Sequence, residues 1–368
     1  MFLKNLHLLN FKNYSSLDLD FIEGINCFTG NNGEGKTNLL DAVYYLSMCK
    51  SYFNFVDSQN IKHGEQYFLI KGSLNINDDD EEIYCGFKLN QGKVFKRKGK
   101  EYQRLSDHIG LFPCVMISPT DINLVWQGSD DRRKLIDSII SQFDPTYLEH
   151  LINYNKALAQ RNAQLKRFAA NRYFEKTELE IWDDYIVASG SQIFRSRTIF
   201  LKDFVPVFNK YYQYLSGGKE TVGIEYETNL REGEFQQILD EALEKDRALQ
   251  YTSVGIHKDD LAFTINNFPL KKQGSQGQQK SFLIAIKLAQ FEYIKNKKGI
   301  KPLLLLDDVF DKLDQSRVSR LMTLVSEDTF GQIFVTDTHR ERIQNIFQEI
   351  NVDVRIFTVK DGEASLSN

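Results

Sequence analysis

Residues 30–37, which read GNNGEGKT, decide the fold of this chain. They fit the pattern G-x-x-x-x-G-K-[ST], the Walker A phosphate loop. The apolar run 25–29 before them predicts a short buried strand, and the apolar spacing over 38–46 after them predicts a helix. A glycine loop between a strand and a helix is the context in which this motif binds phosphate. The alternative interpretation is a glycine-rich turn that arose by chance.

Each residue type in this loop has a chemical reason to be there. The glycines let the backbone curl so that its N–H groups surround an anion, and the helix N-terminus adds partial positive charge. We expect Lys36 to reach the β- and γ-phosphates and the Thr37 hydroxyl to bind Mg²⁺. The sequence therefore predicts an ATP site made of Gly30, Asn31, Asn32, Gly33, Glu34, Gly35, Lys36, Thr37 and Asn38.

Length and composition set limits on the function. The chain has 368 residues, 42% hydrophobic and 26% charged, which is typical of a globular protein with two domains or one interrupted domain. The net charge of −4 means that DNA would need a local basic patch. The scattered cysteines predict buried, reduced thiols. The N-terminus is too short and polar for a signal peptide, and the apolar runs are too short to span a membrane, so we expect a cytoplasmic protein.

The pattern along the chain changes twice, which predicts three segments: 1–117, 118–252 and 253–368. The first reads mainly as strands, with an acidic solvated loop at 78–82. The predicted strands cover Leu6–Phe11, Leu17–Phe21, Tyr67–Ile76, Ile83–Leu89 and Lys93–Lys98. The middle segment reads as helices, and the last returns to alternating strands and helices.

The middle segment contains two stretches with apolar residues at helical spacing. The first follows an approximate heptad at Leu148, Leu151, Leu158 and Leu165, and the second uses Leu179, Trp182, Ile186, Ser189 and Ile193. A polar turn at 169–178 separates them, which favours a short antiparallel helical hairpin. The alternative is a set of ordinary amphipathic helices in one core.

A second motif is an apolar run that ends in two carboxylates. Leu303–Leu306 are four leucines followed by Asp307 and Asp308. Such a run is typical of a strand covered on both faces, and its acidic end is typical of a Walker B element. We expect Asp307 to hold Mg²⁺ through its water shell and Asp308 to act with Lys36 in catalysis, as the base that polarises water. The alternative is that both carboxylates cap the next segment.

A third motif, Ser275-Gln276-Gly277-Gln278, stands at the start of a predicted helix. A serine and a glycine at a helix start form an anion-binding N-terminus. Because one phosphate loop is enough to hold a triphosphate, a second such site predicts contact with the nucleotide of another subunit. The alternative is a polar loop that caps its own helix.

The order of these motifs resembles ATP-binding-cassette proteins, with Walker A, signature, Walker B and then a D-loop at Asp311–Asp314. The wide separation of Walker A from Walker B resembles the chromosome-maintenance and recombination ATPases, in which a helical segment interrupts the cassette. Further strings resemble the RecF family of bacterial recombination proteins: LNFKNY at 9–14, Ile117–Pro119 with Gly128, Arg132, Arg133 and Asp137, and GIHKDDL at 255–261.

Some residues depart from the patterns of these families. The signature begins Gly274-Ser275-Gln276 where transporters have Leu-Ser-Gly, and Lys258 stands where the family often has arginine. Asp308 replaces a longer glutamate, so the resemblance implies a weak, DNA-dependent ATPase that acts mainly as a switch. The Q-loop glutamine has no assigned position. His339 is a candidate γ-phosphate sensor, and the alternative is an ordinary surface histidine.

For DNA, the clearest basic cluster surrounds one predicted strand and turn. It consists of Lys93, Lys96, Arg97, Lys98 and Lys100, with Lys4 and Lys12 as an extension. Such a cluster suits phosphate contacts, and the alternative is a solvated hairpin. A second candidate on the helical hairpin consists of Arg161, Lys166, Arg167 and Arg172.

The residues and the resemblance together predict an α/β fold, a P-loop ABC-type ATPase head with an inserted, mainly helical second domain. The resemblance implies that two copies pair head to tail around ATP and Mg²⁺ and clamp single- and double-stranded DNA at gaps or junctions. It also implies roles in repair, replication and the DNA-damage response, with recombination mediator proteins and a recombinase as partners. The alternatives are a membrane-transporter subunit and the ATPase of a nuclease-coupled defence system.

Overall fold

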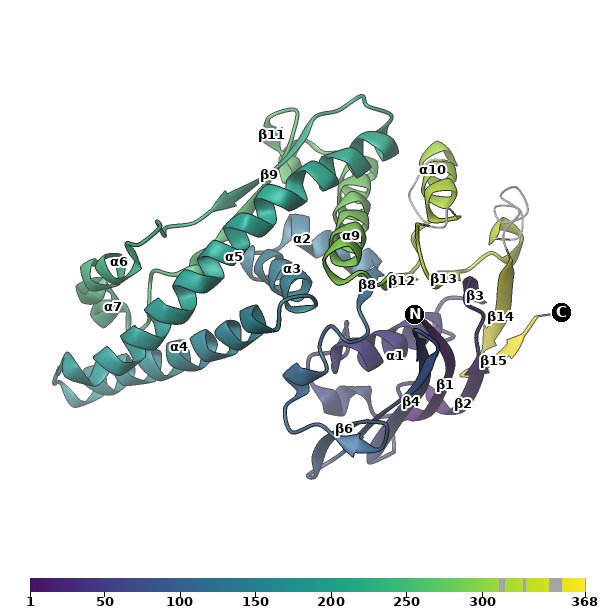
Figure 1. The fold of residues 1–368 in the computed structure, drawn as a ribbon, viewed down its shortest axis with the longest axis horizontal. Helices are drawn as coiled ribbons and strands as arrows, with labels where there is room; N and C mark the ends of the chain where they lie inside the picture. The colour runs from purple at the N-terminus through teal and green to yellow at the C-terminus, as the bar shows by residue number, and fades with distance from the viewer. Residues whose placement is uncertain (311–314, 327–328, 344–352, 368) are drawn as a thin grey trace. The chain divides into compact units, whose positions relative to one another are not determined.

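A computed structural model describes residues 1–310, 315–326, 329–343 and 353–367 (Figure 1). The chain forms two compact units, and each is described separately below. The predicted D-loop at Asp311–Asp314 lies outside the described residues.

The first unit comprises residues 1–122, 211–218 and 275–368, and the second comprises 123–210 and 219–274. Both ends of the chain therefore build one unit, as expected for an interrupted head. The second unit continues past the predicted boundary at 253, because residues up to 274 belong to it. The physical reason is strand pairing: β10 (Asp260–Ile265) is hydrogen-bonded to β9 (Val222–Glu227), which precedes that boundary.

The first unit contains an antiparallel and a mainly parallel sheet. The antiparallel order is β2-β1-β4-β5-β6-β7, with β1 (Phe2–Phe11), β2 (Tyr14–Asp20), β4 (Tyr67–Ile76), β5 (Asp79–Lys88), β6 (Gly92–Arg97) and β7 (Lys100–Glu101). The mainly parallel order is β15-β14-β3-β13-β12-β8, with β3 (Ile25–Thr29), β8 (Cys114–Ile117), β12 (Leu303–Leu306), β13 (Ile333–Asp337), β14 (Val354–Lys360) and β15 (Glu363–Leu366). The helices of this unit are α1 (Lys36–Met48), α9 (Gln276–Lys298), α10 (Gln315–Ser326) and the short turns η1 (Asp57–Asn60), η2 (Leu105–Asp107) and η3 (Pro119–Ile122).

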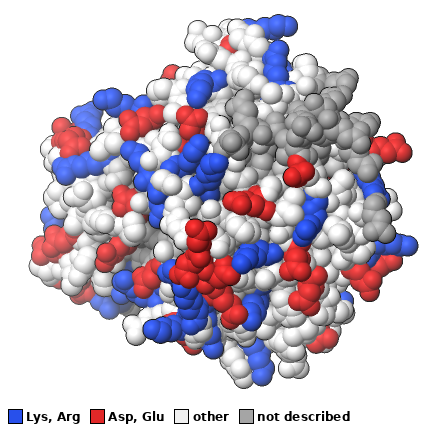
Figure 2. Space-filling view, turned by 45° about the vertical axis from the view of Figure 1, so that its right-hand side comes forward, with Lys and Arg blue, Asp and Glu red and all other residues white. Residues whose placement is uncertain are grey.

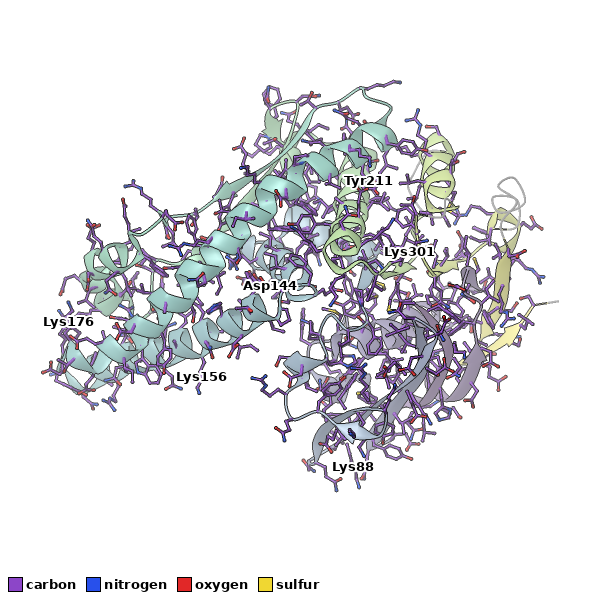
Figure 3. All side chains as sticks on the ribbon, in the orientation of Figure 1. Lys88, Asp144, Lys156, Lys176, Tyr211 and Lys301 are labelled. Carbon is purple, nitrogen blue, oxygen red and sulfur yellow. The ribbon has the colours of Figure 1, made fainter. Side chains whose placement is uncertain are left out.

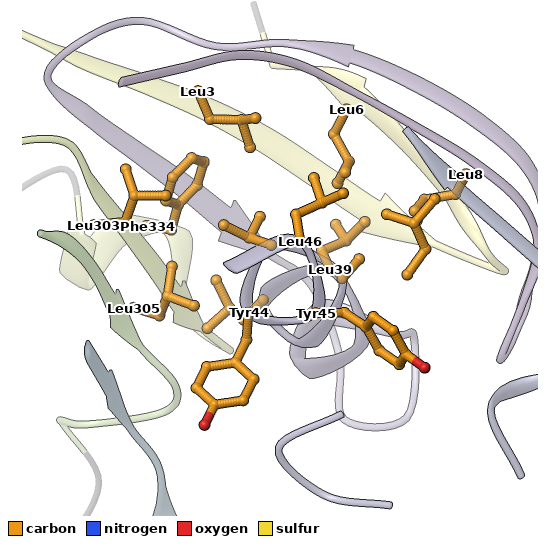
Figure 4. Packing of buried hydrophobic residues seen from close by; sticks show 14 of the residues in the cluster. Leu3, Leu6, Leu8, Leu39, Tyr44, Tyr45, Leu46, Leu303, Leu305 and Phe334 are labelled. Carbon is orange, nitrogen blue, oxygen red and sulfur yellow. The ribbon is translucent and has the colours of Figure 1, made fainter. Parts of the chain in front are cut away.

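Helix α1 packs between these sheets and fills the core of the first unit (Figure 4). Leu39 and Leu46 of α1 meet leucines of β1, and the same cluster continues to Leu303, Leu305 and Phe334 of the parallel sheet. All these side chains are buried. The core thus fixes the Walker A helix against both sheets, which positions the loop at its start.

The acidic stretch that was predicted as a solvated loop is mostly strand. Residues 79–82 belong to β5, and the turn is made by Asn77 and Asp78, whose φ angles are 50° and 66°. Asn and Asp tolerate this left-handed conformation better than most residues. The carboxylates remain in a strand because each one is paired with a cation, as described below.

The second unit is mainly helical, with one small sheet in the order β11-β10-β9. Its elements are α2 (Asn123–Trp126), α3 (Ser129–Ser141), α4 (Pro145–Asn171), α5 (Thr177–Ser216), α6 (Phe235–Glu241), α7 (Leu243–Leu249), η4 (Ile256–Lys258), β11 (Phe268–Pro269) and α8 (Leu270–Gln273). The last residues of α5, from Tyr211 onward, belong to the first unit. Helices α4 and α5 form the predicted antiparallel hairpin and run side by side in Figure 1.

The buried stripe of α4 differs from the predicted heptad of leucines. The heptad that is buried lies one position earlier, at Tyr147, Tyr154, Arg161 and Phe168. Of the predicted leucines, Leu165 is buried, whereas Leu148, Leu151 and Leu158 are half-buried beside this heptad. The aromatic residues face inward because they are apolar. Arg161 can face inward as well, because Asp183 of α5 and Asp246 of α7 compensate its charge. On α5 the predicted Leu179, Ile186, Ser189 and Ile193 are all buried.

Candidate nucleotide-binding site

The parallel sheet brings the phosphate loop and the acidic motif to one edge. β13 is paired in parallel with β3 on one side and β12 on the other, so the carboxyl ends of these strands meet. The phosphate loop follows β3, and Asp307 follows β12. The edge beyond the carboxyl ends of parallel strands is where ligands bind in α/β sheets.

A set of hydrogen bonds joins the two motifs at this edge. Thr37 Oγ1 donates to Asp307 Oδ1 at 2.8 Å, and Thr336 Oγ1 donates to the same oxygen at 2.9 Å. Burial raises the pKa of Asp307, while the two threonine hydroxyls oppose that shift. A hydroxyl and a carboxylate in contact are the oxygen ligands that Mg²⁺ prefers, so the chemistry of this pair fits that ion.

Lys36 is held at the loop by backbone carbonyls. Its Nζ donates to Gly30 O and Asn31 O, both at 2.7 Å, and the residue is 7% exposed. Burial lowers the pKa of Lys36, and nearby carboxylates, led by Asp308, oppose the shift. The ammonium group is therefore fixed beside the loop, and phosphate oxygens can replace the two carbonyl oxygens as acceptors of its hydrogen bonds.

Two of the loop glycines are required by close contacts. A Cβ on Gly30 would lie 2.2 Å from Val359 O, and a Cβ on Gly35 would lie 2.3 Å from Asn13 Nδ2. Gly35 also has a φ of 112°, which L-residues with a side chain rarely adopt. A larger residue at either position would displace the loop.

Asn13 and Tyr14 support the loop from the β1–β2 turn, a role that the sequence analysis missed. Asn13 Nδ2 donates to Glu34 O at 2.9 Å, and Asn38 Nδ2 donates to Asn13 Oδ1 at 2.7 Å. Tyr14 OH donates to Gly35 O at 3.0 Å. The available signal was the string LNFKNY, which contains both residues.

The remaining predicted residues of this edge lie near the end of β12 and β13. Asp308 has a φ of 47°, and its backbone N–H donates to Thr336 Oγ1 at 2.9 Å. His339 is exposed, and its backbone N–H donates to the buried Asp337 at 2.7 Å.

The signature string forms a complete helix cap. Ser275 is the N-cap of α9: its Oγ accepts from Gln278 N at 3.3 Å, and Gln278 Oε1 accepts from Ser275 N at 2.7 Å. Ser275 and Gln276 are exposed. Arg317 Nη1 donates at 2.7 Å to Ser281 Oγ, one turn further along. The string therefore caps its own helix, as the alternative interpretation predicts, and the Ser275 side chain that forms this cap is exposed.

A buried charged relay, which was not predicted, connects the Walker A helix to α9. Lys287 of α9 is paired with Asp121 at 2.9 Å, and both are 5% exposed. Lys287 Nζ also donates to Tyr52 OH at 3.0 Å, and Tyr52 OH donates to Asp121. Tyr52 N in turn donates to Asp41 of α1 at 2.7 Å. The residues are far apart in sequence, so no local pattern signalled the relay.

The predicted DNA patch lies on β6, the turn after it and β7, and two of its cations, Arg97 and Lys98, are paired with acidic residues of the neighbouring strand β5. Arg97 makes two hydrogen bonds to Glu81, both at 2.8 Å, and Lys98 is 2.7 Å from Asp79. Further pairs join Lys4 to Asp80, Lys71 to Glu82, Lys93 to Asp57 and Lys12 to Asp41. Figure 2 shows acidic and basic side chains interspersed in the same way over the described surface of one face.

The second basic candidate requires a correction. Arg161 is fully buried and is paired with Asp183 and Asp246, both at 2.6 Å. It therefore holds α4, α5 and α7 together and cannot contact DNA. In the sequence Arg161 stands close to other cations, but it occupies a heptad position that faces the interior of the hairpin and is therefore buried.

Comparisons with known proteins agree with this architecture. Residues 2–365 match the family described as RecF/RecN/SMC N terminal domain. A solved Smc head domain from Pyrococcus furiosus shares the fold, with a TM-score of 0.58 and 18% identity over 100% of this chain and 96% of that one. Fold and site together define the class: a P-loop ATPase head of the SMC-like recombination group, as predicted.

The individual relatives narrow this class. Proteins described as "DNA replication and repair protein RecF" are 51% identical in Flavobacterium johnsoniae, over 98% of this chain and 100% of the relative, and 48% identical in Phocaeicola vulgatus, over 99% and 98%. A solved structure of the recombination mediator protein RecF with ATP has a TM-score of 0.89 at 30% identity, covering 100% of this chain and 98% of that one. The chain belongs to the RecF family.

These findings confirm the predicted family and fold and favour neither the transporter nor the defence alternative. In the part of the chain that the structure describes, no helix has the length and apolar character needed to cross a bilayer.

Proposed function

We propose that this protein acts in DNA replication and repair as an ATP-gated clamp on DNA. The observation that carries the proposal is the hydrogen bond from Thr37 to Asp307, because it joins motifs that are 270 residues apart in the geometry of a nucleotide site. The relatives described as RecF and the RecF structure with ATP support the same function.

Each residue of the edge has a task in this proposal. ATP with Mg²⁺ supplies the γ-phosphate on which the gate depends. Lys36 and the loop N–H groups would bind the phosphates, and Thr37 with Asp307 would hold the ion. Asp308 would accept the proton of the attacking water. His339 remains the proposed sensor of the γ-phosphate.

The exposed helix start of α9 would complete the site of a second chain. In a head-to-tail dimer, Ser275, Gly277 and Gln278 of one chain would face the nucleotide bound by the other. The helix N-terminus and the serine hydroxyl provide donors for phosphate oxygens. DNA would be held while both nucleotides are bound and released after hydrolysis, and mediator proteins and a recombinase would be the protein partners.

For DNA contact we propose the patch Lys93, Lys96, Arg97, Lys98 and Lys100. Arg97 and Lys98 are paired with acids, whereas Lys96 and Lys100 form no ion pair within the described residues and would reach phosphate without breaking one. Replacing both lysines with alanine should reduce the slope of log affinity against log salt by about 1.4 to 1.8. Lys88→Ala, at an exposed lysine of β5, is the control (Figure 3). An unchanged slope in the double variant would assign the DNA surface elsewhere.

The test of the whole proposal is the mass of the complex in solution. Light scattering should show a monomer without nucleotide and a dimer with ATP and Mg²⁺, and gapped duplex DNA should bind to the dimer. A monomer that binds gapped DNA equally well with and without ATP would overturn the gated clamp.

A further inference from the structure

A second concave site lies on the second unit, at the tip of the α4–α5 hairpin. A small hydrophobic cluster forms there from Leu165, Phe168 and Leu179, which are all buried, with Phe174 and Leu243 packed against it. Lys176 marks the tip in Figure 3. The nucleotide site described above uses none of these residues.

Above this cluster the surface is hollowed by a cavity of about 470 Å³. Leu165 and Phe168 line its floor, and Ala169 of α4 and Ala248 of α7 also line it with small, exposed side chains. Its size lies within the range of roughly 300–1,000 Å³ that is usual for ligand pockets. The two alanines leave space that larger residues would fill.

The aromatic wall of the cavity is held in place by several contacts. The ring of Phe168 packs edge-on against Tyr173 and Phe174, with centroids 5.1 and 5.2 Å apart. The guanidinium of Arg247 lies 4.0 Å from the centre of the Phe174 ring and is 2.7 Å from Glu244. Because these side chains already fix one another, an apolar group entering the cavity would pay little ordering entropy.

One cation at the cavity differs from its neighbours. Arg172 ends α4 with a left-handed φ of 54°, and its exposed side chain lines the cavity. Within the described residues its guanidinium has no recorded ion pair, whereas Arg167 is paired with Glu178 and Lys176 with Asp240. Within the described residues, Arg172 therefore supplies one unneutralised positive charge to a cavity whose lining also includes the apolar side chains of Leu165 and Phe168.

We propose that this cavity docks a peptide segment of a protein partner, which inserts one large apolar side chain and places a carboxylate on Arg172. Guanidinium and carboxylate match in a two-point hydrogen-bonded geometry. A peptide fits better than nucleic acid, because a polyanion needs several free cations, whereas the cavity lining holds two cations and one of them, Arg247, is paired with Glu244. This docking site goes beyond the proposed ATP-gated clamp.

The test uses a phage-displayed library of random 12-residue peptides, selected on the whole protein. Ala169→Trp and Ala248→Trp fill the cavity from opposite helices, and Arg172→Gly removes the charge while keeping the left-handed backbone. Lys156→Ala, at an exposed lysine further along α4, is the matched control (Figure 3). Fluorescence polarisation of the selected peptides gives the affinities, and circular dichroism checks that each variant is folded.

The expected selection is a set of peptides with an acidic residue next to a large apolar one. Either tryptophan variant should weaken their binding at least about 10-fold, and Arg172→Gly should do so for peptides with the acid but not for versions with asparagine in its place. Failure to select peptides, selection of peptides without acids, or equal binding to the filled variants would overturn the proposal. The proposal would also be overturned if a 30-nucleotide single strand of DNA displaced the peptides from the wild type and Arg172→Gly abolished the binding of that strand. In that case the surface would bind nucleic acid.

Discussion

The phosphate-loop edge and the start of the signature helix lie in the same unit, yet they are built differently. At the edge, Lys36 is 7% exposed, and its donors, like the hydroxyl of Thr37, are already satisfied within the chain. At the helix start, Ser275 is exposed, and its hydrogen bonds to other described residues are those of the helix cap with Gln278. The first region is preorganised to hold a ligand in one chain, whereas the second presents its polar groups outward.

This difference shows why an anion-binding pattern has to be judged by its surroundings. Both regions have a helix N-terminus with small polar residues, but one is enclosed by a sheet edge with two carboxylates. In the proposed function, the enclosed region binds nucleotide within one chain. The start of the signature helix contacts a nucleotide only if a second chain brings one. Variants at the phosphate-loop edge and variants at the helix start should therefore fail in different assays.

The largest expected effect is loss of nucleotide binding in Lys36→Ala. The ammonium should make two charge-assisted hydrogen bonds to phosphate oxygens, so its removal should weaken ATP affinity by about 1,000-fold. Isothermal titration measures the affinity, with Lys88→Ala as the control. If ATP binds to Lys36→Ala as it does to the wild type, the edge is not the nucleotide site.

The relay between α1 and α9 should be the next most sensitive feature. Lys287→Met leaves the buried carboxylate of Asp121 without its cation and should lower the free energy of unfolding by about 3–5 kcal/mol. Urea denaturation measures this loss. The double variant Lys287→Met with Asp121→Asn should recover most of it, because no uncompensated charge remains. A single variant that loses under about 1 kcal/mol would mean that the pair does not link the two regions energetically.

Ser275→Arg should separate binding from pairing. In the monomer, ATP affinity should stay near that of the wild type, while ATP-induced dimerisation should weaken at least about 10-fold, since the bulky cation occupies the position of the partner's phosphate. Ser275→Ala is the matched control: both variants lose the cap, about 1 kcal/mol of stability, but only arginine blocks the interface. If Ser275→Arg dimerises normally with ATP, the string is a helix cap and nothing more.

The smallest effect concerns pH at the enclosed region. Burial raises the pKa of Asp307, so its carboxyl group keeps a proton at pH values at which an ordinary aspartate is already ionised. That proton must leave before Mg²⁺ binds. Mg²⁺-dependent ATP affinity should therefore fall several-fold as the pH is lowered toward that pKa, about tenfold per unit at most. By the same shift the folded state holds a proton that the unfolded state has lost, so ionisation of Asp307 lowers stability as pH rises.

Asp307→Asn gives the control for the pH prediction, since an amide does not titrate. Titration calorimetry at several pH values should show the pH dependence of Mg²⁺-dependent binding in the wild type and a smaller one in Asp307→Asn. Equal pH dependence in the two proteins would assign the proton to another group.

How far the sequence predicted the site depends on the range of the interaction. The strand and helix on either side of the glycine loop and the four-leucine strand were predicted correctly, because the pattern of each lies within a few consecutive residues. Asn13 and Lys287 were missed, since their partners Glu34 and Asp121 come from other elements. Likewise the leucines of α4 suggested a heptad one position away from the buried one, because aromatic and charged residues can occupy a hairpin interior when their partners are present.

By itself the sequence determined the family, the ATPase class, the motifs and the existence of a helical hairpin. Hydrophobic period and glycine placement act locally and need no knowledge of neighbours. Only the tertiary structure decided which charges remain available: Arg161 is buried with Asp183 and Asp246, Arg97 and Lys98 are paired with carboxylates of β5, and Arg172 lines a cavity without an ion pair to any residue that the structure describes. Charge along a chain carries no information about its partner, since an ion pair forms only where the fold brings two side chains together.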